Sequence, residues 1–283
     1  MEKVLGDYGQ IQSEVFKIMI DEFGYGIHDK KHNTLFKILM KNIGLLDQSH
    51  SYWQFYLTST LLANNYFHSI TRDSSKVFEY FGAITYAENA FSPYCKNVAN
   101  LINTILGKEI MPLYYMEHAH IDIHHGKMAY DNIVMRAIDL YGEGVIAHIV
   151  RGIESAIYLQ KLAEEDLCAQ LDWMSKKDIY KQIGMGIKER VLQDENNLKV
   201  NYLIEPRGEL SVTHVHDGDE LCVVNKGCLR FISGPTNSYV DLNEGDAVVI
   251  RKNRLHGAVV LSETCHYNIW EAHKITSRPQ VKH

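Results

Sequence analysis

Apolar residues recur every three or four positions from residue 11 to about residue 165, which is the spacing of helices with one apolar face. Only two prolines, Pro93 and Pro112, fall in this stretch, and Gly107, Gly142 and Gly144 stand where helices can end. The pattern predicts helices over 11–24, 29–43, 51–70, 75–106, 110–140 and 143–170. Amphipathic segments of this kind favour an all-α bundle.

From Lys199 onward the pattern changes to short apolar runs with period-two alternation, separated by glycines. The runs are VNYLIE, LSVTHVH, ELCVVN, CLRFIS, SYVDL, DAVVI, GAVVL and HYNIWEA. They predict a small antiparallel β-barrel or sandwich. We therefore expect a helical domain over 1–170, a charged linker or docking segment over 171–198, a β-domain over 199–275 and a polar tail over 276–283.

The composition is that of a soluble globular protein, with 46% hydrophobic and 23% charged residues. A net charge of -6 disfavours a nucleic-acid or anionic-membrane surface and favours small-molecule partners. No apolar run approaches the roughly 20 residues of a membrane helix, and the N-terminus lacks a signal-peptide pattern. The five cysteines form no Cys-x-x-Cys pair, which favours free thiols. We expect a cytoplasmic protein.

The run MEHAHIDIHHG carries the strongest chemical signal in the helical part. His118, Asp122 and His125 are spaced four and three residues apart, so on an α-helix their side chains share one face. Two imidazoles and a carboxylate in this arrangement make half of a non-haem iron site. The alternative is a solvated, histidine-rich helix surface.

A two-metal site needs further ligands from other helices, and two segments offer them. Glu88 lies in the apolar run GAITYAENAF, where a buried carboxylate without a cation is costly, although Glu is mostly exposed. Glu22 and His32 are ten residues apart, and the Gly-Tyr-Gly sequence between them allows a kink that brings both onto one face. His28 competes with His32 for this role.

These six residues and their spacings, within about residues 10–165, resemble the haem-oxygenase-like diiron oxidases and oxygenases. The resemblance implies two Fe(II) ions, and the ligands would be Glu22, His32, Glu88, His118, Asp122 and His125, with the three carboxylates as catalytic residues. Family members usually have one or two helices before the first of these ligands, and N-oxygenase relatives can draw an additional carboxylate from there. Among Glu2, Asp7 and Glu14 we find no convincing counterpart. Either a partner subunit or the segment 171–198 completes the fold, or the site has only six protein ligands.

The stretch GELSVTHVHDGDELCVVNKG resembles the first cupin motif at every defined position. Alternation points His214 and His216 the same way from one strand, and Glu220 arrives from the next strand. A looser second motif supplies His256. The resemblance, over about residues 197–273, implies a site of three histidines and one glutamate for one Fe(II), or for Mn, Ni or Zn. The alternative is a metal-free cupin that binds a ligand.

A haem-oxygenase-like domain followed by a cupin is the arrangement of N-nitrosourea-forming enzymes of the streptozotocin-pathway type, which act in natural-product biosynthesis. This resemblance implies an O2-dependent, iron-dependent oxygenase that hydroxylates an amine or guanidine nitrogen of a small amino-acid-like metabolite. The cupin would perform a second oxidative or rearrangement step. Electrons must come from an external donor, because the chain has no nucleotide-binding glycine fingerprint.

Three other functions stay open at this point. The helical site could carry out oxidative C–C cleavage or desaturation of a fatty or amino acid, because fold and metal set do not determine the substrate. The chain could be a non-catalytic sensor, in which the cupin binds an effector and the helical part dimerises. It could also be an enzyme in which only the cupin works. By analogy with cupins and helical bundles we expect a homodimer.

Overall fold

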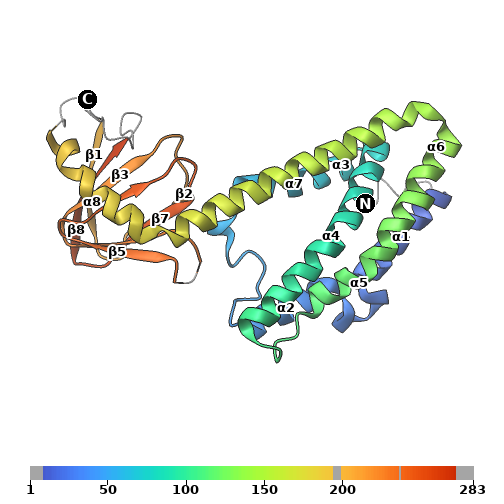
Figure 1. Ribbon diagram of the computed structural model, residues 1–283, viewed down its shortest axis with the longest axis horizontal. Coiled ribbons are helices and arrows are strands. Elements are labelled where there is room, and N and C mark those ends of the chain that lie inside the picture. The colour runs from blue at the N-terminus through green and yellow to red at the C-terminus, as the bar shows by residue number, and fades with distance from the viewer. Residues whose placement is uncertain (1–8, 194–198, 236, 272–283) are drawn as a thin grey trace, which may run out of the picture. The chain divides into compact units, whose positions relative to one another are not determined.

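The computed structural model describes residues 9–193, 199–235 and 237–271, which fold into two compact units (Figure 1). The first unit takes in the residues up to Ser51 together with Thr58–Ala163. The second takes in Tyr52–Leu57 together with the residues from Glu164 onward. The expected tail, 276–283, and residues 194–198 of the expected linker lie outside the described residues.

The first unit is the predicted all-α bundle. Its helices are α1 (Gln10–Glu22), α2 (His32–Asn42), α3 (Thr58–Arg72), α4 (Val77–Leu106), α5 (Leu113–Met128), α6 (Arg136–Tyr141) and α7 (Ile146–Ser175) as far as Ala163. The connections between them include the 3-10 turns η1 (Gly24–Gly26), η2 (His28–Lys30), η4 (Ser74–Lys76) and η6 (Glu143–Val145) and the π-helical η5 (Ala129–Met135). The boundary between the two units falls within α7.

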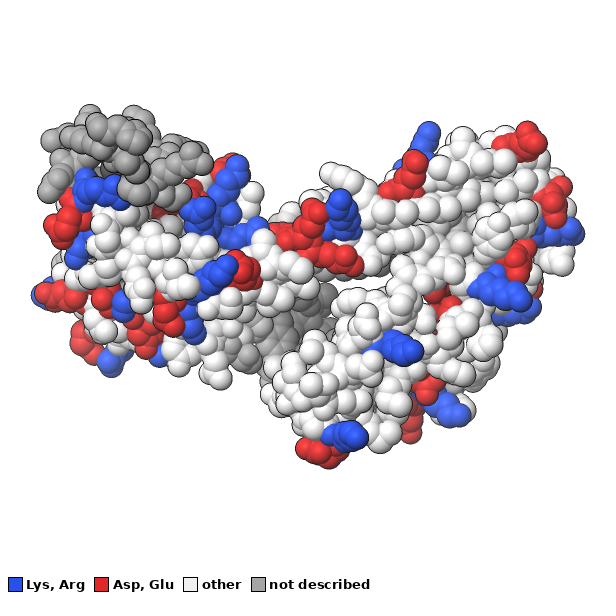
Figure 2. Space-filling view, in the orientation of Figure 1, with Lys and Arg blue, Asp and Glu red and all other residues white. Residues whose placement is uncertain are grey.

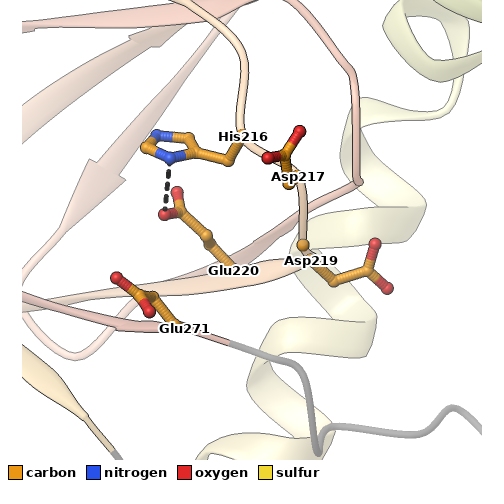
Figure 3. A pocket seen from close by; sticks show the side chains of 6 residues that line it. His216, Asp217, Asp219, Glu220 and Glu271 are labelled. Atoms are coloured by element: carbon orange, nitrogen blue, oxygen red, sulfur yellow. Dashed lines mark ion pairs between the residues drawn. The ribbon is translucent and has the colours of Figure 1, made fainter.

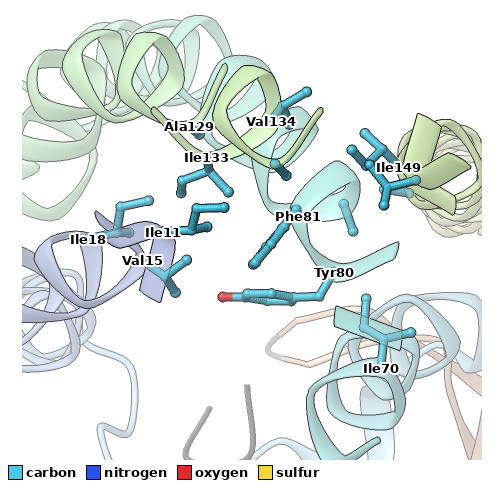
Figure 4. Close-up of a cluster of buried hydrophobic side chains, with 14 residues drawn as sticks. Ile11, Val15, Ile18, Ile70, Tyr80, Phe81, Ala129, Ile133, Val134 and Ile149 are labelled. Atoms are coloured by element: carbon cyan, nitrogen blue, oxygen red, sulfur yellow. The ribbon is translucent and has the colours of Figure 1, made fainter. Parts of the chain in front are cut away.

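The core of the bundle forms where the apolar faces of α1, α4, η5 and α7 meet (Figure 4). From α1 come Ile11, Val15 and Ile18, whose spacing of four and three residues places them on one side of the helix. They pack with Phe81 of α4 and Ile133 of η5, which are almost completely buried. Each such side chain contributes roughly 1.5–3 kcal/mol by leaving water. This cluster holds in place α1 and α4, which carry acidic side chains described below.

Two predicted helix boundaries were wrong. The helix expected over 51–70 begins only at Thr58, and residues 52–57 form the short turn η3 (Trp53–Phe55) in the second unit. There the hydroxyl of Thr213 donates to the carbonyl of Gln54, so a tertiary contact overrides the local helical pattern. The helix expected over 110–140 is divided by η5, whose π-helical turns change the direction of the side chains that follow.

The described residues of the second unit form eight strands, one for each predicted apolar run. They are β1 (Val200–Pro206), β2 (Leu210–His214), β3 (Glu220–Lys226), β4 (Cys228–Ile232), β5 (Tyr239–Asn243), β6 (Ala247–Ile250), β7 (His256–Val260) and β8 (Thr264–Glu271). They form two antiparallel sheets with strand orders β1-β8-β3-β6 and β2-β7-β4-β5. The prediction of a small antiparallel β-domain after a helical domain is confirmed.

Helix α8 (Lys177–Gln193) covers the outer face of the sheet that contains β3 and β6. Leu221 and Val223 of β3 pack in the cluster under this helix, whereas Cys222 and Val224 belong to the interior cluster. Both faces of β3 are therefore buried, which explains its continuous apolar run. Residues 171–193, which the sequence suggested as a linker or docking segment, thus form the end of α7 and the whole of α8 in this unit.

Acidic and basic side chains are interspersed over the described residues on the face seen in Figure 2, and neither sign gathers into one extended patch there. Among the described helices, none is both long enough and apolar enough to cross a membrane.

Candidate metal centres

The polar stripe of α5 is buried rather than solvated. His118, Asp122 and His125 are 5%, 2% and 2% exposed, whereas His124 on the other side of the helix is exposed. The four- and three-residue spacing accounts for this, because it turns all three side chains toward α2 and α4. The alternative of a wet helix surface is therefore wrong.

Glu22 and His32 meet as the Gly-Tyr-Gly kink predicts. Glu22 ends α1, His32 begins α2, and Nδ1 of His32 lies 2.8 Å from Oε2 of Glu22. The same nitrogen lies 3.0 Å from Nε2 of His118. His28, the competing candidate, is exposed on η2. The structure thus places His32, and not His28, beside the stripe on α5.

Gly24 makes this kink possible, and we expect Gly24→Ala to disrupt it. Its φ is +61°, and a Cβ there would lie 2.5 Å from the carbonyl carbon of Lys30, so the start of α2 would have to move. His32 would leave Glu22, and on the dimetal site proposed below the iron that the helical unit takes up on Fe(II) loading should fall by about one ion per chain. Gly26→Ala is the matched control, because its φ is also positive but nothing lies within 4 Å. It should cost only about 1–2 kcal/mol of strain and keep the iron. Equal iron loss in both variants, measured colorimetrically, would contradict this account.

Glu88 joins the cluster from α4, where it is 9% exposed, so the solvent-facing alternative is wrong. Its Oε2 lies 3.2 Å from Nδ1 of His125, and Oδ1 of Asp122 lies 3.5 Å from the same nitrogen. The other ring nitrogen of His125, Nε2, lies 2.8 Å from Oδ2 of Asp21. The sequence analysis missed Asp21. Its only signal was that it forms an acidic pair with Glu22 before the glycine kink.

The sequence offers no convincing residue for the additional carboxylate that N-oxygenase relatives can have, and the structure brings Asp21 close to the cluster. Glu2 and Asp7 lie outside the described residues. Glu14 binds Lys17 at 2.6 Å and Asn132 at 3.1 Å instead. Asp21 is the further carboxylate that reaches the cluster, and it does so from the same helix as Glu22.

The buried charges of this cluster shift one another's pKa. Burial raises the pKa of Glu22, but hydrogen bonds from His118 and His32 outweigh it and lower that pKa to about 2. For Glu88 burial dominates and raises the pKa. Burial lowers the pKa of His125, but the neighbouring carboxylates of Asp122, Glu88 and Asp21 outweigh it and raise that pKa to about 10. The cluster therefore gathers several buried carboxylates, whose negative charge is stabilised by protonated histidines or by other cations.

The same side chains fit metal ions. Ligand atoms converge within 4.8 Å of one another in two groups, one of Glu22, His32 and His118 and one of Glu22, Asp122 and His125. Neither carboxylate oxygen of Asp122 has a hydrogen-bond partner among the described residues. A buried carboxylate in that condition costs free energy unless a cation meets it. Imidazoles with carboxylates are a donor set that suits iron.

A second cluster lies in the β-unit. Ligand nitrogens of His214, His216 and His256 lie within 4.8 Å of one another. His256 begins β7 and pairs with His214, the last residue of β2. His216 follows in the loop, so the expectation that one strand presents both histidines was wrong, although the three rings still meet. The β2–β7 register is irregular between Ser211 and His214.

Glu220 of β3 points toward His216, one of these three histidines (Figure 3). Its Oε1 lies 3.2 Å from Nδ1 of His216, and its Oε2 lies 3.9 Å from Nε2 of His256. Oε2 is buried and has no hydrogen-bond partner within the described part of the chain. Burial raises the pKa of Glu220 to about 7 and lowers the pKa of His256 to about 4. Metal ions bind neutral imidazoles and carboxylates, and a buried carboxylate without a counter-charge is stabilised by a bound cation. The four side chains therefore fit a metal-binding site.

A cavity of about 300 Å³ opens beside the three histidines. Its walls are mostly apolar and include Leu229, Phe231 and Ile250. Tyr267 also lines it and donates a hydrogen bond of 2.7 Å to Glu205, which is a further lining residue. The cavity is large enough for a small metabolite next to the histidine cluster.

Comparisons with known proteins found a similar curated protein and similar solved structures. A nitrosourea synthase from Streptomyces achromogenes subsp. streptozoticus is 44% identical over 269 residues, which are 95% of this chain and 57% of that protein. The chain thus spans little more than half the length of this relative. A cupin-2 domain protein from Shewanella frigidimarina is 26% identical over 27% of this chain and 71% of its own, with a TM-score of 0.24. KdgF from Halomonas sp. is 25% identical over 26% and 67%, also with a TM-score of 0.24.

The match that covers most of the helical unit is to a family model. Residues 3–160 match the haem-oxygenase-like model described as an iron-containing redox enzyme. This stretch contains all six of the helical acidic and histidine residues singled out in the sequence, together with Asp21. The chain therefore belongs to the haem-oxygenase-like family of iron-containing redox enzymes.

Proposed function

We propose that this protein is an O2-dependent oxygenase that hydroxylates an amine or guanidine nitrogen of a small amino-acid-like metabolite at a dimetal site in the helical unit. The observation that carries the proposal is that Glu22 belongs to both groups of converging ligand atoms. A carboxylate shared by two groups is what a pair of neighbouring metal ions requires. Glu88, which bonds His125, completes the set.

Bound iron would supply the activation of O2 and the exchange of electrons. The side chains around it hold the ligands in place. Nδ1 of His118 donates to the carbonyl of Tyr114 at 2.8 Å, which leaves Nε2 for a metal. Phe91 and Tyr114 pack against the His118 ring at centroid distances of 5.1 and 4.4 Å, so the ring is fixed and shielded from water. Burial raises the pKa of Tyr114, so its hydroxyl stays protonated at neutral pH.

The β-unit would hold one further iron and perform the second step. Nδ1 of His214 donates to the carbonyl of Val212 at 2.7 Å, and Nδ1 of His256 donates to that of Arg254 at 2.9 Å. Both rings therefore keep Nε2 free as a ligand. Glu220 either completes the ligand set or holds His216 in place. The adjoining cavity would receive the hydroxylated product of the helical unit.

The choice of nitrogen as the oxidised atom is supported by the relative at 44% identity, which is a nitrosourea synthase. Each N-hydroxylation consumes one O2, two electrons and two protons. One oxygen atom enters the N–OH group and the other leaves as water. An external reductant must therefore supply the electrons.

The test is to load the full chain anaerobically with Fe(II), add O2 and a chemical reductant, and screen amines and guanidines, including arginine, by mass spectrometry. We expect a product heavier by one oxygen atom, absent with Asp122→Ala. With His214→Ala we expect the hydroxylated compound to accumulate without further conversion, because only the β-unit site is damaged. Failure of every nitrogen compound, together with turnover of a fatty or amino acid carbon chain, would overturn the proposal.

A further inference from the structure

His125 is held by carboxylates at both of its ring nitrogens. Nδ1 faces the metal-binding cluster, at 3.2 Å from Glu88 and 3.5 Å from Asp122. Nε2 faces away from it and lies 2.8 Å from Oδ2 of Asp21. The ring is 2% exposed, so it has no room to exchange these partners for water.

Asp21 and Glu22 are neighbours in sequence but differ in their contacts with the metal-binding cluster. The two groups of converging ligand atoms in the described part of the helical unit both contain Glu22, and neither contains Asp21. Asp21 therefore reaches the metal-binding cluster only through the imidazole of His125. A carboxylate in that position accepts the ring N–H, selects the tautomer and makes the opposite nitrogen a stronger ligand.

We propose that Asp21 is a positioning residue that keeps the proton of His125 on Nε2, so that His125 binds metal through Nδ1. The inference rests on the proposed dimetal site. His118, seven residues earlier on the same helix, has the opposite arrangement, because its Nδ1 donates to the carbonyl of Tyr114. The two histidines of one helix face thus bind with different nitrogens, and Asp21 is what distinguishes His125.

The first test reads the tautomer directly. The full chain, labelled with 15N-histidine and loaded with Zn(II) as a diamagnetic probe, is examined by two-bond proton–nitrogen correlation, with His125→Gln to assign the signals. We expect Nδ1 of His125 to be metal-bound and Nε2 to carry the proton. Metal on Nε2 would overturn the inference and leave the dimetal proposal intact. Absence of any Zn(II)-bound histidine from the helical unit would overturn both.

The second test reads affinity. In the full chain with His214→Ala, which weakens the β-unit site, Asp21→Ala should lower the Zn(II) affinity of the helical unit about 10- to 100-fold. Asp21→Asn should lose less, because the amide oxygen still accepts the Nε2–H, and it should keep metal on Nδ1. Glu14→Ala is the matched control, since Glu14 lies on the same helix and bonds only Lys17 and Asn132 among the described residues. A purely structural role predicts that Asp21→Asn loses as much affinity as Asp21→Ala and that metal stays on Nδ1 in Asp21→Ala, and that result would refute the proposal.

Discussion

Asp122→Ala is expected to empty the helical unit of iron, so that a chain holding about three ions after anaerobic Fe(II) loading holds about one. The side chain is 2% exposed, neither of its oxygens has a hydrogen-bond partner among the described residues, and it converges with Glu22 and His125. It is therefore the group that depends most on a cation. Iron per chain, measured with a colorimetric chelator, checks the expectation.

The same variant should lose most of the stability that metal confers. A ligand present at about 1,000 times its Kd stabilises the folded state by about 4 kcal/mol, and this increment should vanish from thermal unfolding of the variant. Asp131→Ala is the matched control, because Asp131 is exposed a few turns further along the chain. His214→Ala should leave about two ions. Retention of about three ions by Asp122→Ala would show that the helical cluster is not a metal site.

Gly152→Ala is expected to destabilise the helical unit by about 3 kcal/mol, the upper part of the range for overpacking. Helices α4 and α7 touch through their backbones, and a Cβ on Gly152 would lie 1.9 Å from the carbonyl oxygen of Glu79. Gly82 faces Ile149 in the same way, also at 1.9 Å. No side chain can move aside to relieve this contact, so the helices must separate. Urea unfolding followed by circular dichroism measures the loss.

Two further variants test whether the crossing itself is the cause. Gly144→Ala should be close to neutral, because nothing lies within 4 Å of the added Cβ. The double variant of Gly82 and Gly152 should cost less than the sum of the single variants, because the first substitution already separates the helices. Additive costs, or a Gly152→Ala as mild as Gly144→Ala, would contradict the close approach.

The sequence alone was sufficient wherever the information is local. The spacing of His118, Asp122 and His125 placed them on one face, because helical periodicity depends only on neighbours along the chain. The eight apolar runs of the C-terminal part likewise became eight strands. In both cases the spacing of apolar and polar residues along the chain indicates which side chains are buried.

Only the tertiary structure decided which distant groups meet. Asp21 contacts a histidine 104 positions away, whereas its neighbour Glu22 contacts His32 and His118, and no local rule divides an acidic pair in this way. The same holds for residues 52–57, which leave their predicted helix and join the β-unit. Such contacts follow from how whole helices and sheets pack. Their energies depend on groups that are far apart in the chain. A pattern of neighbouring residues therefore does not predict these contacts.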